Sequence, residues 1–202
     1  MFRQNESVTD KIREAFKPTP VRQRIQSATI KLRTQSDKLQ RTINQMESRD
    51  SSIHAKCVAA LGARDASTAT VYANECVEIR KMIKTSMKSQ MCLEQATMRL
   101  DTIQEFGDLA HGMSLVKTVL GTIKNELQGK LPEISTGIAD VEDSLQNITM
   151  DIGQAIDVDG MSAIANDESA RILKEADLVA EQKMTEKFPE IPPSLYGSTR
   201  LK

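Results

Sequence analysis

Hydrophobic residues recur every three or four positions along most of the chain, which is the period of a helix. The first long run predicts a helix of roughly 28 residues that begins after Pro20 and ends near Ser48. Pro18 and Pro20 precede it and separate it from the N-terminal segment, because proline removes a hydrogen-bond donor and displaces its predecessor from helical geometry. The apolar seam comprises Val21, Ile25, Ala28, Leu32, Gln35, Leu39, Ile43 and Met46.

The apolar rhythm lapses across residues 48–52, where Ser, Arg and Asp favour turns and caps. We therefore expect a tight reversal there. A second helix is predicted from Ile53 to Phe106, without a proline, although Gly62 and the 67–70 stretch could bend it. Together the two helices would form a long antiparallel hairpin.

Beyond Gly107 the spacing becomes stricter and predicts two shorter helices on either side of residues 129–132. Such regular seams resemble those of coiled coils and need a partner surface, either the hairpin or another subunit. The first seam is Leu109, Met113, Val116, Leu120, Ile123 and Leu127, and the second is Ile134, Ile138, Val141, Leu145, Ile148 and Ile152.

The C-terminal part begins with a polar linker at residues 157–160. Asn166 is expected to cap a helix that ends near Lys187, because two acidic residues follow it at the positive helix end. Residues 188–195 then contain three prolines, which favour an extended ribbon that costs little entropy to bind. The predicted fold is all-α: a long antiparallel hairpin, shorter helices packed against it and a flexible acidic C-terminal region.

The N-terminal segment carries a short amphipathic helix at residues 7–16. Val8, Ile12, Ala15 and Phe16 supply its apolar side, and lysine and arginine lie on the other; Phe2 precedes the helix and is expected to insert with it. It could insert into a membrane interface or dock loosely on the rest of the protein.

Composition and charge narrow the choice of function. There is no Trp, and 4 Phe with 2 Tyr are too few to fill a thick core, which favours narrow seams between helices. Residues 1–100 hold 18 Lys and Arg against 10 Asp and Glu, whereas residues 101–202 hold 9 against 18. A basic half seeks a polyanion, either lipid headgroups or nucleic acid. Seven basic residues of the first helix lie off its seam: Arg22, Arg24, Lys31, Arg33, Lys38, Arg41 and Arg49.

No catalytic or metal-binding pattern is found, and no cofactor is expected. Cys57, Cys76 and Cys92 form no CxxC pair and indicate reduced, buried thiols. His54 with Cys57 supplies only two ligands, and the methionines of the second helix are typical of adaptable packing. Neither a signal peptide nor an apolar stretch of the ~20 residues needed to span a membrane is present, which predicts a cytoplasmic or peripheral protein, and not an enzyme.

This order of elements and the charge polarity resemble the ESCRT-III family, above all its archaeal CdvB-type cell-division members, over residues 8–196. The resemblance implies filaments of this chain and sister subunits on anionic membrane, at the inner face of the cell membrane and the division site. It also implies a switch in which the acidic C-terminal part closes on the basic hairpin. The corresponding divisions are residues 1–17, a core at 18–156, an acidic linker and helix at 157–187 and a tail at 188–202.

The tail resembles the family's type-2 MIT-interacting motif, which lies in a groove of the MIT domain of a remodelling AAA ATPase. The resemblance assigns the groove contacts to Phe188, Pro189, Ile191 and Pro192, with Leu195 extending them, and places Glu190 at the rim. The leucine-rich type-1 motif is not matched, and the sequence has no room after the ribbon for the winged helix of some archaeal members. The alternatives are a soluble coiled-coil adaptor and a nucleic-acid-associated basic protein; the latter is disfavoured because stacking aromatics are missing.

Overall fold

The computed structural model describes residues 20–106, 109–153 and 162–191. These residues form five helices and no strand, which confirms the all-α prediction. The helices are α2 (Val21–Gly62), α3 (Ala66–Phe106), α4 (Leu109–Gln128), α5 (Pro132–Gly153) and α6 (Ser162–Lys187). The predicted N-terminal helix with Phe2, Val8, Ile12 and Phe16 lies outside the described residues, as do Pro192 and Leu195.

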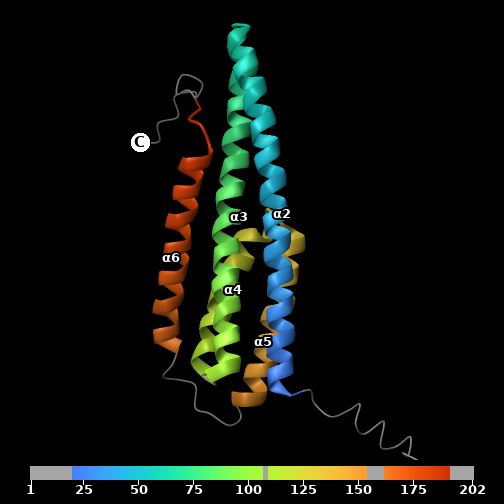
Figure 1. Cartoon of the computed structure of the whole chain (residues 1–202), viewed down its shortest axis with the longest axis vertical. Coiled ribbons are helices and arrows are strands. Elements are labelled where there is room, and N and C mark those ends of the chain that lie inside the picture. The colour runs from blue at the N-terminus through green and yellow to red at the C-terminus, as the bar shows by residue number, and fades with distance from the viewer. Residues whose placement is uncertain (1–19, 107–108, 154–161, 192–202) are drawn as a thin grey trace, which may run out of the picture.

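Helices α2 and α3 form the predicted hairpin, but the chain reverses at residues 63–65 rather than at 48–52 (Figure 1). Arg64 adopts a left-handed conformation with φ of 58°. The amide of Asp65 donates to the Ala60 carbonyl at 3.0 Å and that of Arg64 to the Leu61 carbonyl at 3.0 Å. This bonding pattern ends a helix with a left-handed residue, a position that usually holds glycine.

The expected reversal at 48–52 is wrong because Asp50 occupies a seam position of a continuous helix. Met46, Asp50, Ile53 and Cys57 follow one another at helical spacing, and all four are buried. Ser51 also fits the helix, since its hydroxyl donates to the Glu47 carbonyl at 3.1 Å. Long-range packing thus overrides the local turn preference, and α2 runs for 42 residues.

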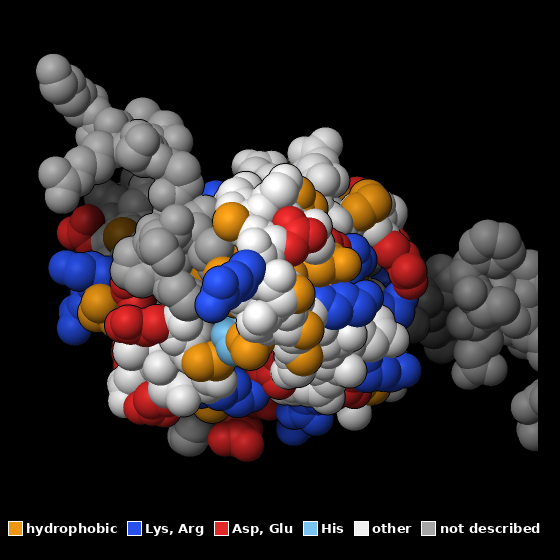
Figure 2. Space-filling view, turned by 90° about the horizontal axis from the view of Figure 1, so that it is seen from above, with side chains coloured by type: hydrophobic (Ala, Val, Ile, Leu, Met, Phe, Trp, Pro, Cys, Tyr) orange, Lys and Arg blue, Asp and Glu red, His pale blue; other side chains and the backbone are white. Residues whose placement is uncertain are grey.

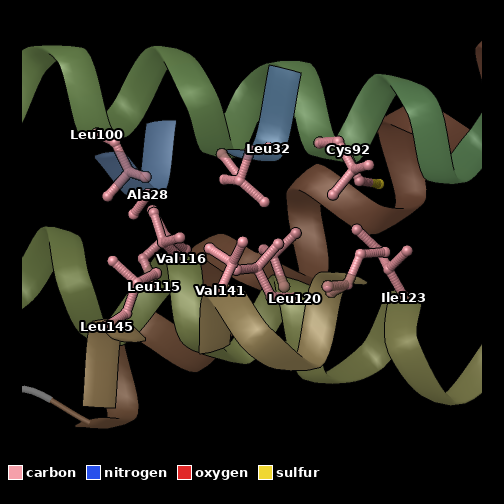
Figure 3. Close-up of a cluster of buried hydrophobic side chains, with 14 of the residues drawn as sticks. Ala28, Leu32, Cys92, Leu100, Leu115, Val116, Leu120, Ile123, Val141 and Leu145 are labelled. Carbon is pink, nitrogen blue, oxygen red and sulfur yellow. The ribbon is translucent and has the colours of Figure 1, made fainter. Parts of the chain in front are cut away.

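The half of the hairpin away from its tip is completed to a bundle by α4 and α5. Helix α2 packs on α3 and α5, and α4 packs on the same two helices. The seam residues from Met113 to Leu127 and from Ile134 to Ile148 are at most 4% exposed, which confirms both predicted seams over these residues. The side chains of Leu109 and Ile152, at the two ends of the predicted seams, lie outside the described part of the structure. In this bundle core, side chains from different helices point toward one another, as with Leu32, Leu100 and Leu120 (Figure 3).

The acidic C-terminal region includes α6, which lies alongside the hairpin and packs against α3 and α4 (Figure 1). It ends at Lys187 as expected but begins at Ser162, one turn before the predicted cap at Asn166. Burial of Ala165 against the bundle core extends the helix beyond the local capping signal. The backbone carbonyl of Asn166 instead accepts a hydrogen bond from the Ser169 hydroxyl at 2.8 Å.

The half of the hairpin toward the tip has its own apolar cluster, the hairpin core. Its buried residues are Ile43, Met46, Ile53, Cys57, Ala69, Ala73, Cys76, Ile79, Ile83, Met87, Ala180 and Ile191. All three cysteines are free and buried, as predicted. Burial raises the pKa of Cys76 to about 11 and that of Cys92 to about 12. The Cys76 and Cys92 thiols are therefore protonated and unreactive at neutral pH.

Candidate functional site

Two features on the hairpin are candidates for function: the seven first-helix cations and the ribbon after α6. Four of the seven cations form ion pairs. Arg24 pairs with Asp151 and Lys38 with Glu133, at 2.7 Å for the lysine, and both carboxylates belong to α5. Two more pairs, Arg33 with Asp101 and Arg49 with Glu75 at 2.8 Å and 2.7 Å, link α2 to α3.

The other three cations, Arg22, Lys31 and Arg41, are exposed and have no ion pair among the described residues. The structure therefore does not gather the seven cations on one uninterrupted positive surface. The four paired cations lie on two flanks of α2, Arg24 and Lys38 next to α5 and the other two next to α3.

The four ion pairs of the first-helix cations do not involve the acidic C-terminal helix. Asp177 and Glu181 of α6 approach Lys84 of α3 instead, at 3.5 Å and 3.3 Å. The acidic part does lie on the hairpin, as the resemblance implies, but on a different basic residue. The carboxylates next to Arg24 and Lys38 come from α5.

These ion pairs are weak enough to exchange partners. The carboxylates of Glu133 and Asp151 are 81% and 60% exposed in their pairs. Exposed pairs of this kind contribute about 0 to 1 kcal/mol each. The hydrogen bond and charge of Lys38 lower the pKa of the Glu133 carboxyl, which favours its charged form.

The ribbon begins where α6 ends and turns its apolar side chains toward the hairpin. Ile191 is 6% exposed and belongs to the hairpin core, and Phe188 is half-buried against the same cluster. Pro189 and Glu190 are exposed. Of the five predicted ATPase contacts, the structure thus brings Phe188 and Ile191 onto the chain's own hairpin.

Arg80 of α3 holds the ribbon. Its Nη1 donates to the Pro189 carbonyl at 2.6 Å, and its Cζ lies 5.1 Å from the centroid of the Phe188 ring. The rest of the guanidinium binds Asp50 of α2 through two hydrogen bonds, Nε to Oδ1 at 2.9 Å and Nη2 to Oδ2 at 3.0 Å. The arginine is therefore bound on two edges and covered by an aromatic ring.

The side chains of this pair are shielded from water, with Asp50 3% and Arg80 13% exposed. Lys187 extends the contact by pairing with Glu47 at 2.7 Å. A hollow of about 260 Å³ beside the ribbon is lined by both of these residues together with Asp50, Ser51, His54, Phe188 and Pro189.

Sequence reasoning missed both Asp50 and Arg80. The available signal was the unbroken helical spacing from Met46 through position 50 to Ile53 and Cys57. A charged residue on such a seam needs a partner of opposite charge on the facing helix. Only the folded hairpin identifies Arg80 as that partner.

The described residues contain no group of three or more His, Cys, Asp or Glu side chains placed to hold a metal ion. Cys57 is buried, with its Sγ 3.4 Å from the Ala69 carbonyl oxygen, and His54 is half-buried beside the ribbon. No helix in the described part of the chain combines the length and the apolarity needed to cross a bilayer.

Viewed from the hairpin tip, hydrophobic side chains gather near the centre of the molecule, with charged groups around them (Figure 2). Val58 and Val71, on the two helices next to the tip, are 54% and 62% exposed. The tip therefore presents apolar surface to solvent.

Comparison with known proteins gives concordant matches. The sequence profile of the Snf7 family matches residues 27–194. Cell division protein B1 of Sulfolobus acidocaldarius is 36% identical over 173 residues, which cover 86% of this chain and 81% of that protein. Cell division protein B of the same organism is 29% identical over 168 residues, covering 83% of this chain and 64% of that protein. No solved structure matches the chain.

Proposed function

Because the chain belongs to the Snf7, or ESCRT-III, family, we propose that it is a filament-forming subunit that assembles on anionic membrane during cell division. The proposed assembly contains further copies of this chain and sister subunits. It constricts or severs the membrane at the division site, on the cytoplasmic side. Both relatives are named as cell division proteins, which supports the cellular role.

The seven first-helix cations support contact with an anionic surface. Arg22, Lys31 and Arg41 are exposed and have no ion pair among the described residues. Each cation near an anionic membrane contributes about 1 kcal/mol, so these three alone supply useful affinity. The four cations that form ion pairs can add to this membrane affinity when lipid phosphates replace the carboxylates as their partners. The apolar tip at Val58 and Val71 supports subunit contact, because large exposed apolar residues favour association.

Remodelling by an MIT-domain AAA ATPase is the second part of the proposal. The ribbon of Phe188, Pro189, Ile191 and Pro192, extended by Leu195, would occupy the groove of that domain. An extended proline-bearing ribbon suits a groove between helices because its backbone is already ordered before binding.

Co-sedimentation with vesicles tests the membrane contact. Reversing Arg22, Lys31 and Arg41 to Glu should abolish sedimentation with vesicles rich in phosphatidylserine at low salt. Reversing three exposed α6 cations, Arg171, Lys174 and Lys183, changes the net charge equally and should have little effect. Equal losses from both triple variants would reject the α2 surface as the membrane contact.

Electron microscopy of the purified chain on the same vesicles tests assembly. Filaments on anionic but not neutral vesicles are the expected result. A discrete small oligomer under every condition would instead favour a soluble adaptor. A shift of DNA at matched salt without vesicle binding would favour a nucleic-acid-associated protein.

A further inference from the structure

The surface around Arg80 has the properties of a peptide-binding site. We propose that this site recognises an aromatic-proline-x-aliphatic ribbon and that its occupant is Phe188–Ile191 of the same chain. The ribbon must leave this site before it can enter any other groove. This release step rests on the proposed function, because the competing groove is that of the MIT domain. The site itself stands on the contacts within the chain.

Each part of the ribbon meets a matching group on the hairpin. The Phe188 ring covers the Arg80 guanidinium, a cation-π arrangement that favours an aromatic residue at this position. The Pro189 carbonyl accepts from Arg80 Nη1 at 2.6 Å, and the extended backbone carries Ile191 into the hairpin core. Glu190, the x position, is exposed and contributes no recognition.

Asp50 makes the site rigid before the ribbon arrives. Its two carboxylate oxygens bind Nε and Nη2 on one edge of the guanidinium, which fixes the plane of Arg80 and directs Nη1, on the other edge, toward the ribbon. An apolar pair at these positions would pack between α2 and α3 and give equal or greater stability, because burying two charges costs desolvation free energy. The charged pair therefore gives the hairpin a function that apolar residues could not, namely a donor and a flat cation for the ribbon.

The ribbon also anchors α6. The fully buried α6 residues are small, Ala165, Ser169, Ala176 and Ala180, and they remove little apolar area from water. The larger apolar residues of the helix, Ile172, Leu173 and Met184, pack on the cores but are only partly buried. After the helix, Ile191 adds a buried large side chain, and Phe188 packs on the same cluster. Lys187 adds its pair with Glu47. Extraction of the ribbon should therefore loosen the C-terminal half of α6 as well.

Competition follows from which side chains face the hairpin. Phe188 and Ile191 are the apolar residues that a second groove would take, and both are engaged with the chain's own hairpin. A partner that binds only the released ribbon has an apparent affinity reduced by the fraction released. Arg80 would thus set how readily the ribbon is captured.

A spin-label distance measurement on the full chain tests the hairpin site. Labels are placed at two exposed positions, Ser67→Cys near the tip and Glu190→Cys on the ribbon, while the three native cysteines are buried. The parent should give one narrow distance population. Asp50→Asn with Arg80→Gln, which leaves a neutral amide pair and an intact ribbon, should broaden it. The matched control, Arg33→Gln with Asp101→Asn, removes another α2–α3 pair that does not contact the ribbon and should not broaden it.

Calorimetry with a purified MIT domain of an ESCRT-III AAA ATPase tests the competition in the same variants, without labels. The Asp50→Asn, Arg80→Gln chain should bind about tenfold more tightly than the parent. Phe188→Ser with Ile191→Ser should lose binding although its ribbon is also released. Circular dichroism and thermal unfolding establish that each variant is folded.

The outcomes separate the two proposals. An unchanged narrow distance population in the folded Asp50→Asn, Arg80→Gln chain overturns the hairpin site. Broadening without MIT binding by any variant supports the hairpin site and rejects the MIT assignment. Broadening with equal MIT affinity in parent and variant rejects the competition.

Discussion

Asp50 and Arg80 form a two-hydrogen-bond ion pair across the hairpin, and the same arginine binds the Pro189 carbonyl. Removing one member leaves the other charge buried without compensation. We expect Asp50→Ala to lower the free energy of unfolding by about 3 to 5 kcal/mol. Replacing both residues, Asp50→Leu with Arg80→Met, should be neutral or stabilising. Urea unfolding measures both effects, and a loss below about 1 kcal/mol for Asp50→Ala would contradict the burial of the pair.

The carboxylates of α5 limit how many α2 cations reach an anionic membrane. Glu133→Gln and Asp151→Asn should free Lys38 and Arg24, raising vesicle binding by about fivefold for each freed cation. Asp140→Asn with Asp143→Asn removes as many charges from exposed positions of the same helix without freeing an α2 cation, and is the matched control. The difference between the two double variants should shrink at high salt. Equal gains in both would mean that net charge, and not pairing, controls the binding.

Gly137 of α5 lies against the buried amide of Gln35 on α2. An added Cβ would lie 2.4 Å from Gln35 Nε2 and 2.5 Å from its Cδ. Gln35 has little room to move, since it is 8% exposed and its Oε1 finds no hydrogen-bond partner among the described residues. Gly137→Ala should therefore destabilise the chain by about 1 kcal/mol or more.

In a Gln35→Ala background the same change should stabilise, because alanine is the better helix former by about 1 kcal/mol. Urea unfolding of the parent, the two single variants and the double variant measures the coupling free energy between Gly137 and Gln35. If Gly137→Ala has the same sign in both backgrounds, the α2–α5 contact differs from that described.

Stability should fall in acid through two carboxylates at helix starts. Hydrogen bonds from Thr68 lower the pKa of Asp65 from its usual range, and the hydrogen bond and charge of Lys38 lower that of Glu133. Near these values the unfolded chain binds more protons than the folded chain, so stability rises with pH. This contribution is present above the unfolded pKa values and is lost as pH falls through the lower folded values.

Asp65→Asn should keep the α3 cap and weaken the pH dependence, because asparagine caps without titrating. Urea unfolding from about pH 3 to pH 6 measures the slope. Glu133→Gln should remove the other contribution. A slope unchanged by both substitutions would show that neither carboxylate is responsible.

The helices whose signals are local could be predicted from the order of residues alone. The seams of α4 and α5 were correctly predicted from spacing alone, and Pro132 marks the start of α5 because proline suits the first helical turn. The end of α6 at Lys187 and the burial of the three cysteines were also confirmed. In these cases each residue's own chemistry is sufficient to indicate its environment.

The position of the hairpin turn and the surface that the acidic part covers depend on packing between distant segments. Asp50 is tolerated on an apolar seam because Arg80 faces it from a position 30 residues later. Arg64 takes the left-handed turn position because the two packed helices meet there. The partner of a buried charge is fixed by packing between distant segments, so local periodicity could predict the helices but not the contacts that join Asp50, Arg80 and the ribbon.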